Sequence, residues 1–305
     1  MYDVLAIGEL NSDIIMTGFK ELPQLGREIM GESFTQVLGS STAICAAGLS
    51  ALDLRVGFHG LIGDDDGGRF ARAALQATGV DTTHCIVDSN TSTGVTIALN
   101  MQGDRALVTY LGAIEAFCFD QIDLALLKET RHIHVGSFFL QHALRPGLAG
   151  LFKLAQEAGV TTSLDAGWDD SGTWDGGLAE VLKYTTIFFP NETEALHITK
   201  AATPLEAAKQ LTAQINVVKC GADGAVAYRD GGIYTGKPFT VTPIDTTGAG
   251  DSFNAGFLYG FLNGFAMEDC LTYGNACGAF SVTKIGGASA CATLTDVRAM
   301  IDAKQ

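Results

Sequence analysis

The sequence predicts an α/β protein whose central sheet is mostly parallel and is covered by helices on both faces. Two observations carry this prediction: short apolar stretches alternate with helix-like stretches, and glycine is abundant, with 37 of 305 residues. Such alternation is typical of β–α–β units, whose parallel strands are buried on both sides. With 47% hydrophobic and 17% charged residues, the chain can bury a large core. We expect one domain over residues 1–305.

Apolar runs and capping residues locate the elements in chain order. Gly79 and Gly159 end two helical stretches, and Thr203, Pro204 and Glu206 form an N-terminal capping pattern for a third. These patterns predict strands over residues 2–7, 55–61, 131–135, 160–164 and 216–219, and helices over residues 42–52, 68–78, 146–158 and 203–214. His132 and His134 alternate within one strand, and one of them is expected to face outward.

Two segments, residues 14–37 and 91–110, interrupt this alternation. Neither has a helical pattern, and the second is typical of a hairpin with strands 94–101 and 105–110 around Gln102, Gly103 and Asp104. We expect the two segments to form a small β-sheet inserted in the domain, acting as a lid.

The composition excludes several classes of protein. Lys and Arg number 19 and Asp and Glu number 34, which gives a net charge of −15. Nucleic-acid and anionic-membrane binders need a basic face, so neither partner is expected. No apolar run reaches the length of a membrane span, and the N-terminus lacks the basic region of a signal peptide. Seven widely spaced cysteines without a C-x-x-C pattern indicate reduced thiols and a cytoplasmic location.

The segment from Asp245 to Phe257 carries the clearest chemistry. Gly248, Ala249 and Gly250 let the backbone approach another group closely, at the start of an apolar helix whose N-terminus favours an anion. Asp251 follows in the first turn. It is either an acid that caps the helix or a base that accepts a proton from a hydroxyl attacking a phosphate.

The same segment, continued to Leu258, matches the second signature of the ribokinase-like (PfkB) carbohydrate kinases without a mismatch, and the chain resembles this family. The resemblance implies a ribokinase-like three-layer α/β/α sandwich with a small β-sheet lid. It also implies an enzyme that transfers the γ-phosphoryl group of ATP to an alcohol group. Asp251 would be the general base, and the amides of Gly248, Ala249 and Gly250 would form the anion hole.

Further motifs match the family in the same order along the chain. The resemblance implies substrate contacts from Asn11, Asp13, Gly39, Ser40 and Ser41. It implies ATP contacts from Asn191, Glu194, Lys219, Gly221, Gly224 and Asn275, with Glu194 linked indirectly to Mg²⁺. By matching position, a K⁺ ion would lie near Asp245, Thr247, Ser281, Lys284 and Gly286. Asn191 and Glu194 also form a capping box, which explains both residues without a metal.

One departure bears on the substrate. Ile44 stands where the family has an asparagine that reaches the sugar, and an apolar side chain cannot hold a hydroxyl. Sugars, polyols and nucleosides therefore all stay open. The arginines of the lid segments are Arg27 and Arg105, of which Arg105 is a candidate for substrate contact. A phosphorylated sugar needs fixed cations, so an unphosphorylated substrate is favoured.

Two other functions stay open. A vitamin-type kinase of the same superfold would act on an alcohol such as pyridoxal or hydroxymethylpyrimidine, although such relatives generally lack the lid. A catalytically silent regulator would bind sugar or nucleotide without turnover. The lid also makes a homodimer plausible, since it forms dimer contacts in relatives.

Overall fold

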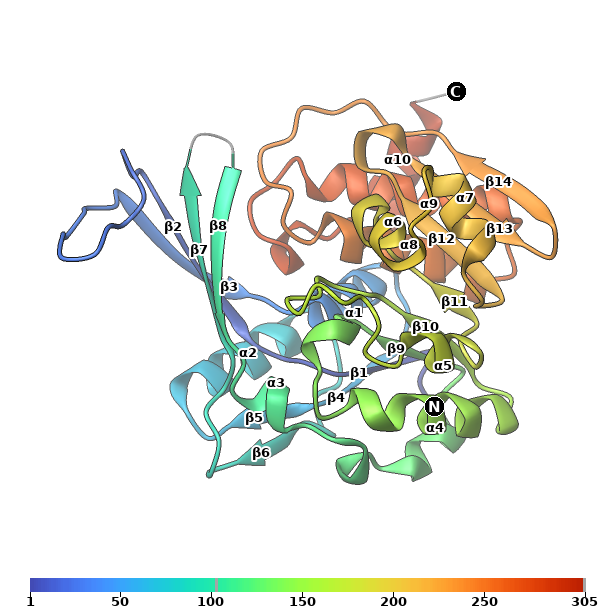
Figure 1. Ribbon diagram of the computed structural model, residues 1–305, viewed down its shortest axis with the longest axis horizontal. Helices are drawn as coiled ribbons and strands as arrows, with labels where there is room; N and C mark the ends of the chain where they lie inside the picture. The colour runs from blue at the N-terminus through green and yellow to red at the C-terminus, as the bar shows by residue number, and fades with distance from the viewer. Residues whose placement is uncertain (102–103, 304–305) are drawn as a thin grey trace.

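The protein, described by a computed structural model over residues 1–101 and 104–303, is built around one large twisted sheet (Figure 1). Five neighbouring pairs of strands are parallel and two pairs at one edge are antiparallel. The order across the sheet is β14 (Gly232–Gly236), β13 (Ala225–Arg229), β12 (Ile215–Lys219), β11 (Ile187–Phe188), β10 (Thr161–Leu164), β9 (His132–Val135), β1 (Val4–Ile7) and β4 (Val56–His59).

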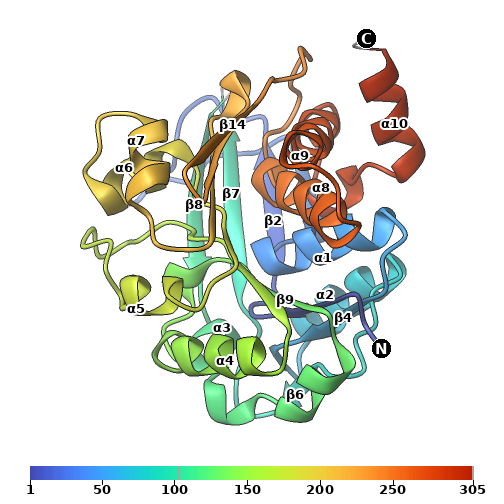
Figure 2. The ribbon, with the colours of Figure 1, turned by 90° about the vertical axis from the view of Figure 1, so that its right-hand side faces the viewer.

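Helices cover both faces of this sheet, which confirms the predicted α/β/α layers (Figure 2). Alternate residues of β1 show why: Val4 and Ala6 join one buried cluster, and Leu5 and Ile7 join another. The first face carries α1 (Ser41–Ala51), α2 (Asp66–Ala77), α8 (Ala249–Leu262) and α9 (Met267–Ser281), with α10 (Leu294–Asp302) against α9. The second carries α3 (Ala113–Ala116), α4 (Arg145–Glu157), α5 (Leu178–Leu182), α6 (Glu192–Thr199) and α7 (Pro204–Gln210).

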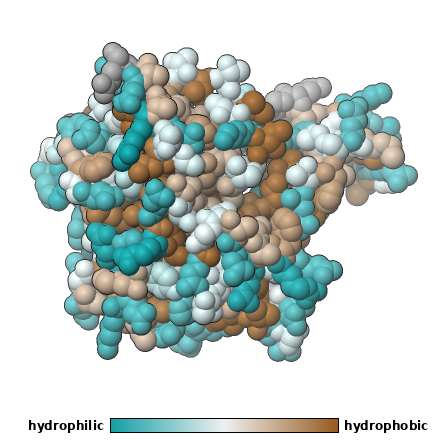
Figure 3. Space-filling view, turned by 180° about the vertical axis from the view of Figure 1, so that it is seen from behind, coloured by the Kyte–Doolittle hydropathy of each residue, from teal (hydrophilic) through white to brown (hydrophobic). Residues whose placement is uncertain are grey.

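A separate four-stranded sheet projects from the body, as the sequence predicts (Figure 1). Its order is β3 (Ser33–Leu38), β2 (Ser12–Thr17), β7 (Val95–Met101) and β8 (Asp104–Tyr110), and we call these four strands the lid. Figure 3 shows the lid standing out on the right, with hydrophobic residues where it meets the body. The expected turn at Gln102 and Gly103 lies outside the described residues.

Several element boundaries differ from the prediction. The expected strand 55–61 is divided at Gly60 into β4 and the short β5 (Leu61–Gly63), which pairs with β6 (Ile86–Asp88). A Cβ at Gly60 would lie 2.2 Å from the carbonyl oxygen of Gly8, so only glycine permits this approach. Helix α7 ends at Gln210 rather than near 214: Leu211 is already extended, and the Asn216 side chain donates to the carbonyls of Leu211 and Ala213.

The expectation that one strand histidine faces outward is wrong. His132 and His134 are two residues apart, so they share one face of β9, and both are fully buried beneath α8. Both rings hydrogen-bond to the Ser163 hydroxyl at 2.8 Å, and His132 also bonds Thr161 at 2.7 Å. Burial lowers the pKa of both imidazoles, that of His134 to about 4, so both rings are neutral.

The remaining composition-based expectations can be compared with the described chain directly. All seven cysteines are free thiols, as predicted. In the part of the chain that the structure describes, no helix has the length and apolar character needed to cross a bilayer.

Candidate active site

The candidate site lies where the parallel strands of the large sheet end, beside the base of the lid. Ligands of open α/β sheets bind at this carboxyl edge, because the loops there are free to vary. Here Glu9 follows β1, Asp165 follows β10, and Lys219 is the last residue of β12. Helices α1 and α8 direct their N-termini to the same place, which brings residues more than 200 positions apart into contact.

The N-terminus of α8 has the form expected of an anion hole. Gly248 is the N-cap residue with φ of +72°, and as a glycine it has no side chain to cap the helix. A Cβ at Gly248 would lie 2.9 Å from Gly287 Cα and 3.0 Å from Ile44 Cγ2, so the turn requires glycine for space as well as conformation. Ile44 is buried and packs against this turn, so its apolar side chain supports the glycine turn.

Asp251, in the first turn of α8, is joined to α1 by a hydrogen bond. The Ser41 hydroxyl donates to Asp251 Oδ1. Burial, reinforced by the charge of Asp165, raises the pKa of Asp251 to about 7, although Lys219 and Ser41 act in the opposite direction. A carboxylate with this pKa is a stronger base than an exposed aspartate and can accept a proton near neutral pH.

A buried cation stands next to this carboxylate. Lys219 Nζ lies 2.6 Å from Asp165 Oδ2 and 3.3 Å from Asn254 Oδ1, and Asn254 Nδ2 lies 2.7 Å from the same Asp165 oxygen. Burial alone would lower the pKa of Lys219, but the charges of Asp165 and Glu194 outweigh it and raise that pKa. Nζ would be 3.2 Å from a Cβ at Gly250, so the ammonium lies beside the anion hole.

The predicted capping box is present on α6. The Asn191 side chain accepts from the Glu194 amide at 2.9 Å, and the Glu194 carboxylate accepts from the Asn191 amide at 2.8 Å. Burial, with the charge of Asp165, raises the pKa of Glu194 to about 8. Glu194 is therefore both a helix cap and a member of the buried charged group around Lys219.

Side chains of the protein itself accept hydrogen bonds from the N-terminus of α1. Glu9 is buried and accepts from the Thr42 hydroxyl at 2.6 Å and from the Thr42 amide at 3.1 Å. Ser40, with φ of +72°, accepts from the Ala43 amide at 3.1 Å and donates to the Glu9 carbonyl. The Ser40 hydroxyl is thus bound to α1 and β1, whereas Ser41 points to Asp251.

The predicted sugar-binding residues meet at the base of the lid. Asn11 Nδ2 lies 3.2 Å from Asp13 Oδ1 and 3.5 Å from Thr96 Oγ1 of β7. A Cβ at Gly39 would lie only 2.1 Å from Asp13 Oδ1, so glycine is needed here for the carboxylate to pass. The structure therefore brings Asn11, Asp13 and Gly39 together.

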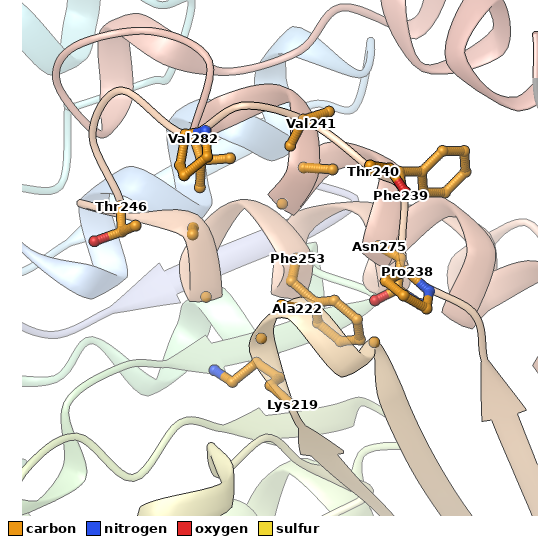
Figure 4. A pocket seen from close by; sticks show the side chains of 17 residues that line it. Lys219, Ala222, Pro238, Phe239, Thr240, Val241, Thr246, Phe253, Asn275 and Val282 are labelled. Atoms are coloured by element: carbon orange, nitrogen blue, oxygen red, sulfur yellow. The ribbon is translucent and has the colours of Figure 1, made fainter.

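A mostly apolar cavity of about 460 Å³ opens on the other side of the α8 N-terminus (Figure 4). Lys219 and Thr246 lie at one end, and Pro238, Phe239 and Asn275 lie at the other. The predicted ATP residues Gly221 and Gly224 and the predicted anion-hole residue Gly250 also line it. Residues 239–244 form no strand and contribute Phe239, Thr240, Val241 and Pro243 to the wall.

Three of the predicted K⁺ residues lie together. Asp245 Oδ1 accepts from the Thr247 amide at 2.9 Å and the Thr247 hydroxyl at 2.7 Å, and Oδ2 accepts from the Gly286 amide at 3.0 Å. The Ser281 hydroxyl instead donates to the Gly278 carbonyl, and the Lys284 ammonium lies 4.2 Å from the centre of the Phe280 ring.

The basic residues of the lid segments are placed unequally. Arg27 is exposed and pairs with Glu21 at 3.0 Å. The side chain of Arg105 lies outside the described residues, so its predicted substrate contact stays a prediction.

Sequence reasoning did not assign three buried residues of this site. Glu9, Asp165 and Asn254 hold α1 and Lys219 in place, but none has a role in the motifs discussed above. The available indication was position, because Glu9 and Asp165 each follow a buried strand at the carboxyl edge. Asn254 lies one turn beyond Asp251 on α8, which directs it to the same side.

Comparison with known proteins agrees with this geometry. The model of the pfkB family carbohydrate kinases matches residues 1–294. An ATP-dependent ribose-1-phosphate kinase from Halopiger xanaduensis is 32% identical over 95% of both chains. A 5-dehydro-2-deoxygluconokinase from Shouchella clausii is 27% identical over 99% of this chain and 96% of its own.

The fold has close counterparts among solved structures. Arabidopsis thaliana ribokinase, solved with ribose and ATP, superposes with a TM-score of 0.84 at 23% identity over 98% of both chains. A match over nearly the whole chain, to one family model and to kinases throughout, shows the family directly. The chain belongs to the pfkB family of carbohydrate kinases.

Proposed function

We propose that the protein transfers the γ-phosphoryl group of ATP to a hydroxyl of a small, unphosphorylated sugar, polyol or nucleoside. One observation carries the proposal: Asp251 lies in the first turn of α8, a helix that lines the cavity together with Lys219, and its hydrogen bond to Ser41 joins it to α1, which follows Gly39 beside Asn11 and Asp13. A base placed between a phosphate site and an alcohol site suits phosphoryl transfer.

The cavity fits a nucleotide in size and polarity. Its volume of about 460 Å³ is within the usual range of small-molecule sites, and its apolar walls suit an adenine ring. We place the base near Phe239 and Asn275 and the phosphates near Gly250 and Lys219. The helix amides and one buried ammonium offset the phosphate charge locally, in a chain whose net charge is −15.

Mg²⁺ would be held largely by the nucleotide. Among the residues the structure describes, no group of three or more His, Cys, Asp and Glu side chains is arranged for a metal ion. Magnesium commonly binds through phosphates, waters and one or two carboxylates, so a site with Glu194 nearby is a fit. When bound, the ion would neutralise charge developing on the phosphates.

K⁺ would bind beside the α8 turn. Asp245 and the carbonyls near Ser281, Lys284 and Gly286 provide oxygen donors, which suit a hard cation. Asp245 also ties the loop at Gly286 to the turn that carries Gly248, so this region supports the anion hole in its own right.

Asn11 and Asp13 would hold the acceptor's hydroxyls, with one hydroxyl directed at Asp251. The acceptor would displace Ser41 from the carboxylate, give its proton to Asp251 and attack the γ-phosphorus. Lys219 and the Gly248–Gly250 amides would hold the charge on the transferred group. Closure of the lid would exclude water and limit ATP hydrolysis.

A coupled assay of ADP release tests this function. The panel should contain free sugars, polyols and nucleosides, with ribose 1-phosphate and 5-dehydro-2-deoxygluconate as the acceptors that the names of the two relatives indicate. We expect turnover with an unphosphorylated acceptor. Turnover restricted to ribose 1-phosphate would contradict the substrate class, turnover restricted to a pyridoxal-like alcohol would indicate a vitamin kinase, and ATP binding without any turnover would indicate a silent regulator.

We also propose that the lid forms a homodimer. Residues paired across strands share one face of a sheet, and Ile97 pairs with Val108 while Phe34 pairs with Met16. Phe34 and Val108 are each 62% exposed, on the face opposite to Asp13. Sedimentation of the wild type against Val108→Glu tests this: the proposal requires a dimer that the charge disrupts, and a wild-type monomer contradicts it.

A further inference from the structure

We propose that Ser41 is itself a phosphoryl acceptor, so that the ATP-loaded protein phosphorylates its own Ser41 when no sugar-like substrate is present. This inference rests on the proposed function, because it uses ATP as donor and Asp251 as base. It adds a modification site on the protein and a self-limiting reaction at the active centre.

The hydroxyl of Ser41 has a different partner from the hydroxyls of the two residues beside it. Ser40, Ser41 and Thr42 are consecutive at the start of α1. Ser40 donates to the Glu9 carbonyl, and Thr42 donates to the Glu9 carboxylate at 2.6 Å and accepts from the Gly136 amide at 3.0 Å. Ser41 alone of the three donates to Asp251, so its hydroxyl occupies the place that a substrate hydroxyl needs.

The second observation is the surroundings of this pair. Asp251 directly follows Gly250, and Lys219 Nζ would be 3.2 Å from a Cβ at Gly250. Ser41 and Asp251 are half-buried and so remain accessible to a nucleotide, unlike the fully buried Thr42. The carboxylate that binds Ser41 is therefore the one next to the cation and helix amides assigned to the phosphoryl group.

The chemistry needs no group beyond ATP and the residues named. The Ser41 oxygen attacks the γ-phosphorus of ATP and forms the new O–P bond, while its proton passes to the Asp251 carboxylate. The bond between the γ-phosphorus and the bridging oxygen breaks, and its electron pair leaves with ADP. The products are phosphoserine 41, ADP and a proton on Asp251 that is released to water.

Two consequences follow from the position. A phosphate on Ser41 would place a dianion beside Asp251 and fill the acceptor position, so the modified protein would lose turnover. A substrate that displaces Ser41 from Asp251 would protect it. Phosphorylation should therefore accumulate only in substrate-free, ATP-loaded protein.

The experiment uses the full chain incubated with ATP and Mg²⁺ without acceptor, followed by intact mass and phosphopeptide sequencing. We expect up to one phosphoryl group per chain, located at Ser41 rather than Ser40 or Thr42, and a matching loss of turnover. Ser41→Ala and Asp251→Asn should remove the modification. Ser89→Ala, in the exposed turn after β6, should retain it, and Ser41→Thr tests whether a hydroxyl at this position suffices.

The outcomes separate this inference from the proposed function. Phosphorylated Ser41 in a protein that turns over no acceptor of the panel would support the inference and contradict the proposed substrate class. Turnover of an acceptor with unmodified Ser41 after prolonged incubation would overturn the inference alone. Phosphate on another residue, or modification that persists in Asp251→Asn, would also overturn it, and absence of both reactions would overturn both proposals.

Discussion

Helices α1 and α8 meet at the site. The N-cap residue of each has a positive φ, but the groups bound at the two N-termini differ. Both begin at a residue with φ of +72°, Ser40 in α1 and Gly248 in α8. In α1 the end is filled, because Ser40 caps the Ala43 amide and Glu9 accepts from the Thr42 amide and hydroxyl. In α8 the N-cap residue is Gly248, which has no side chain to cap the helix. The two starts share a positive φ but differ in ψ, which is 121° at Ser40 and 7° at Gly248, and they differ in whether the N-cap residue has a side chain that can cap the helix.

The comparison shows that a glycine-rich helix start does not by itself locate a phosphate site. What differs is whether the protein already supplies the negative charge that the helix end attracts. At α1 the charge is Glu9, whose carboxylate accepts from the Thr42 amide, and at α8 the acid of the first turn, Asp251, is hydrogen-bonded to Ser41. Most of the substitutions predicted next change one of these two helix N-termini.

Asp251→Asn should have the largest effect. The variant keeps the size of the side chain and a contact for Ser41 but cannot accept a proton, so we expect kcat to fall by about 10²–10⁴-fold with KM for the acceptor little changed. Steady-state kinetics with the acceptor found in the panel would measure this. A kcat within a few-fold of wild type would remove Asp251 as the general base.

Gly248→Ala should obstruct the α8 end. The new Cβ would meet Gly287 and Ile44 in addition to the cost of a left-handed residue, so we expect kcat to fall by about tenfold or more and stability to drop by about 2–4 kcal/mol.

Gly264→Ala is the matched control for that variant. Its φ is +73° and nothing lies within 4 Å of its Cβ, so it isolates the backbone cost of about 1–2 kcal/mol. Equal losses in the two variants, measured by urea unfolding, would mean that the packing against Gly287 and Ile44 contributes nothing.

Glu9→Ala should remove the carboxylate that binds the N-terminus of α1. The Thr42 amide and hydroxyl would lose a buried partner, which we expect to cost about 1–3 kcal/mol of unfolding free energy. Glu9→Gln keeps one acceptor oxygen and should lose less. If the two variants unfold at the same denaturant concentration as wild type, Glu9 does not stabilise the start of α1.

The acidity of Asp251 gives a pH dependence of turnover. Because the base must be deprotonated and burial raises its pKa to about 7, kcat/KM should rise several-fold between pH 6 and pH 8 and level off above. Lys219 lowers this pKa, so Lys219→Met should move the rising limb to higher pH. A flat profile from pH 5 to 8 would contradict the assignment.

Glu194→Gln should have the smallest effect. The pKa of Glu194 is raised from 4.5 to about 8, so the folded protein binds more protons than the unfolded chain in this interval and stability falls as pH rises through it. Glutamine keeps the acceptor for the Asn191 amide but does not titrate. The loss of stability from pH 5 to 8 should shrink by about 1–2 kcal/mol, as urea unfolding at several pH values would show.

Much of the fold and part of the candidate site could be predicted from the sequence, because local residue patterns determine them. The β–α alternation predicted the layers, and the turn from Asp245 to Asp251 predicted the position of the proposed anion hole. The roles of Glu9, Asp165 and Asn254 could not be predicted, since each depends on which buried groups meet at the end of the sheet. Likewise, the burial of both His132 and His134 reflects the helix that covers β9.

The chain formed by Thr161, His132, Ser163 and His134 can hold its hydrogen atoms in two complete orders. In one order His134 Nε2 carries an unprotonated lone pair, and in the other it carries a hydrogen. This nitrogen is buried and has no hydrogen-bond partner within residues 1–101 and 104–303. Both orders leave the rings neutral, and exchange between them would reverse a row of dipoles acting on Asp165. The hydrogen-bond chain beside Asp165 thus allows two orders of its hydrogen atoms with the same heavy-atom positions.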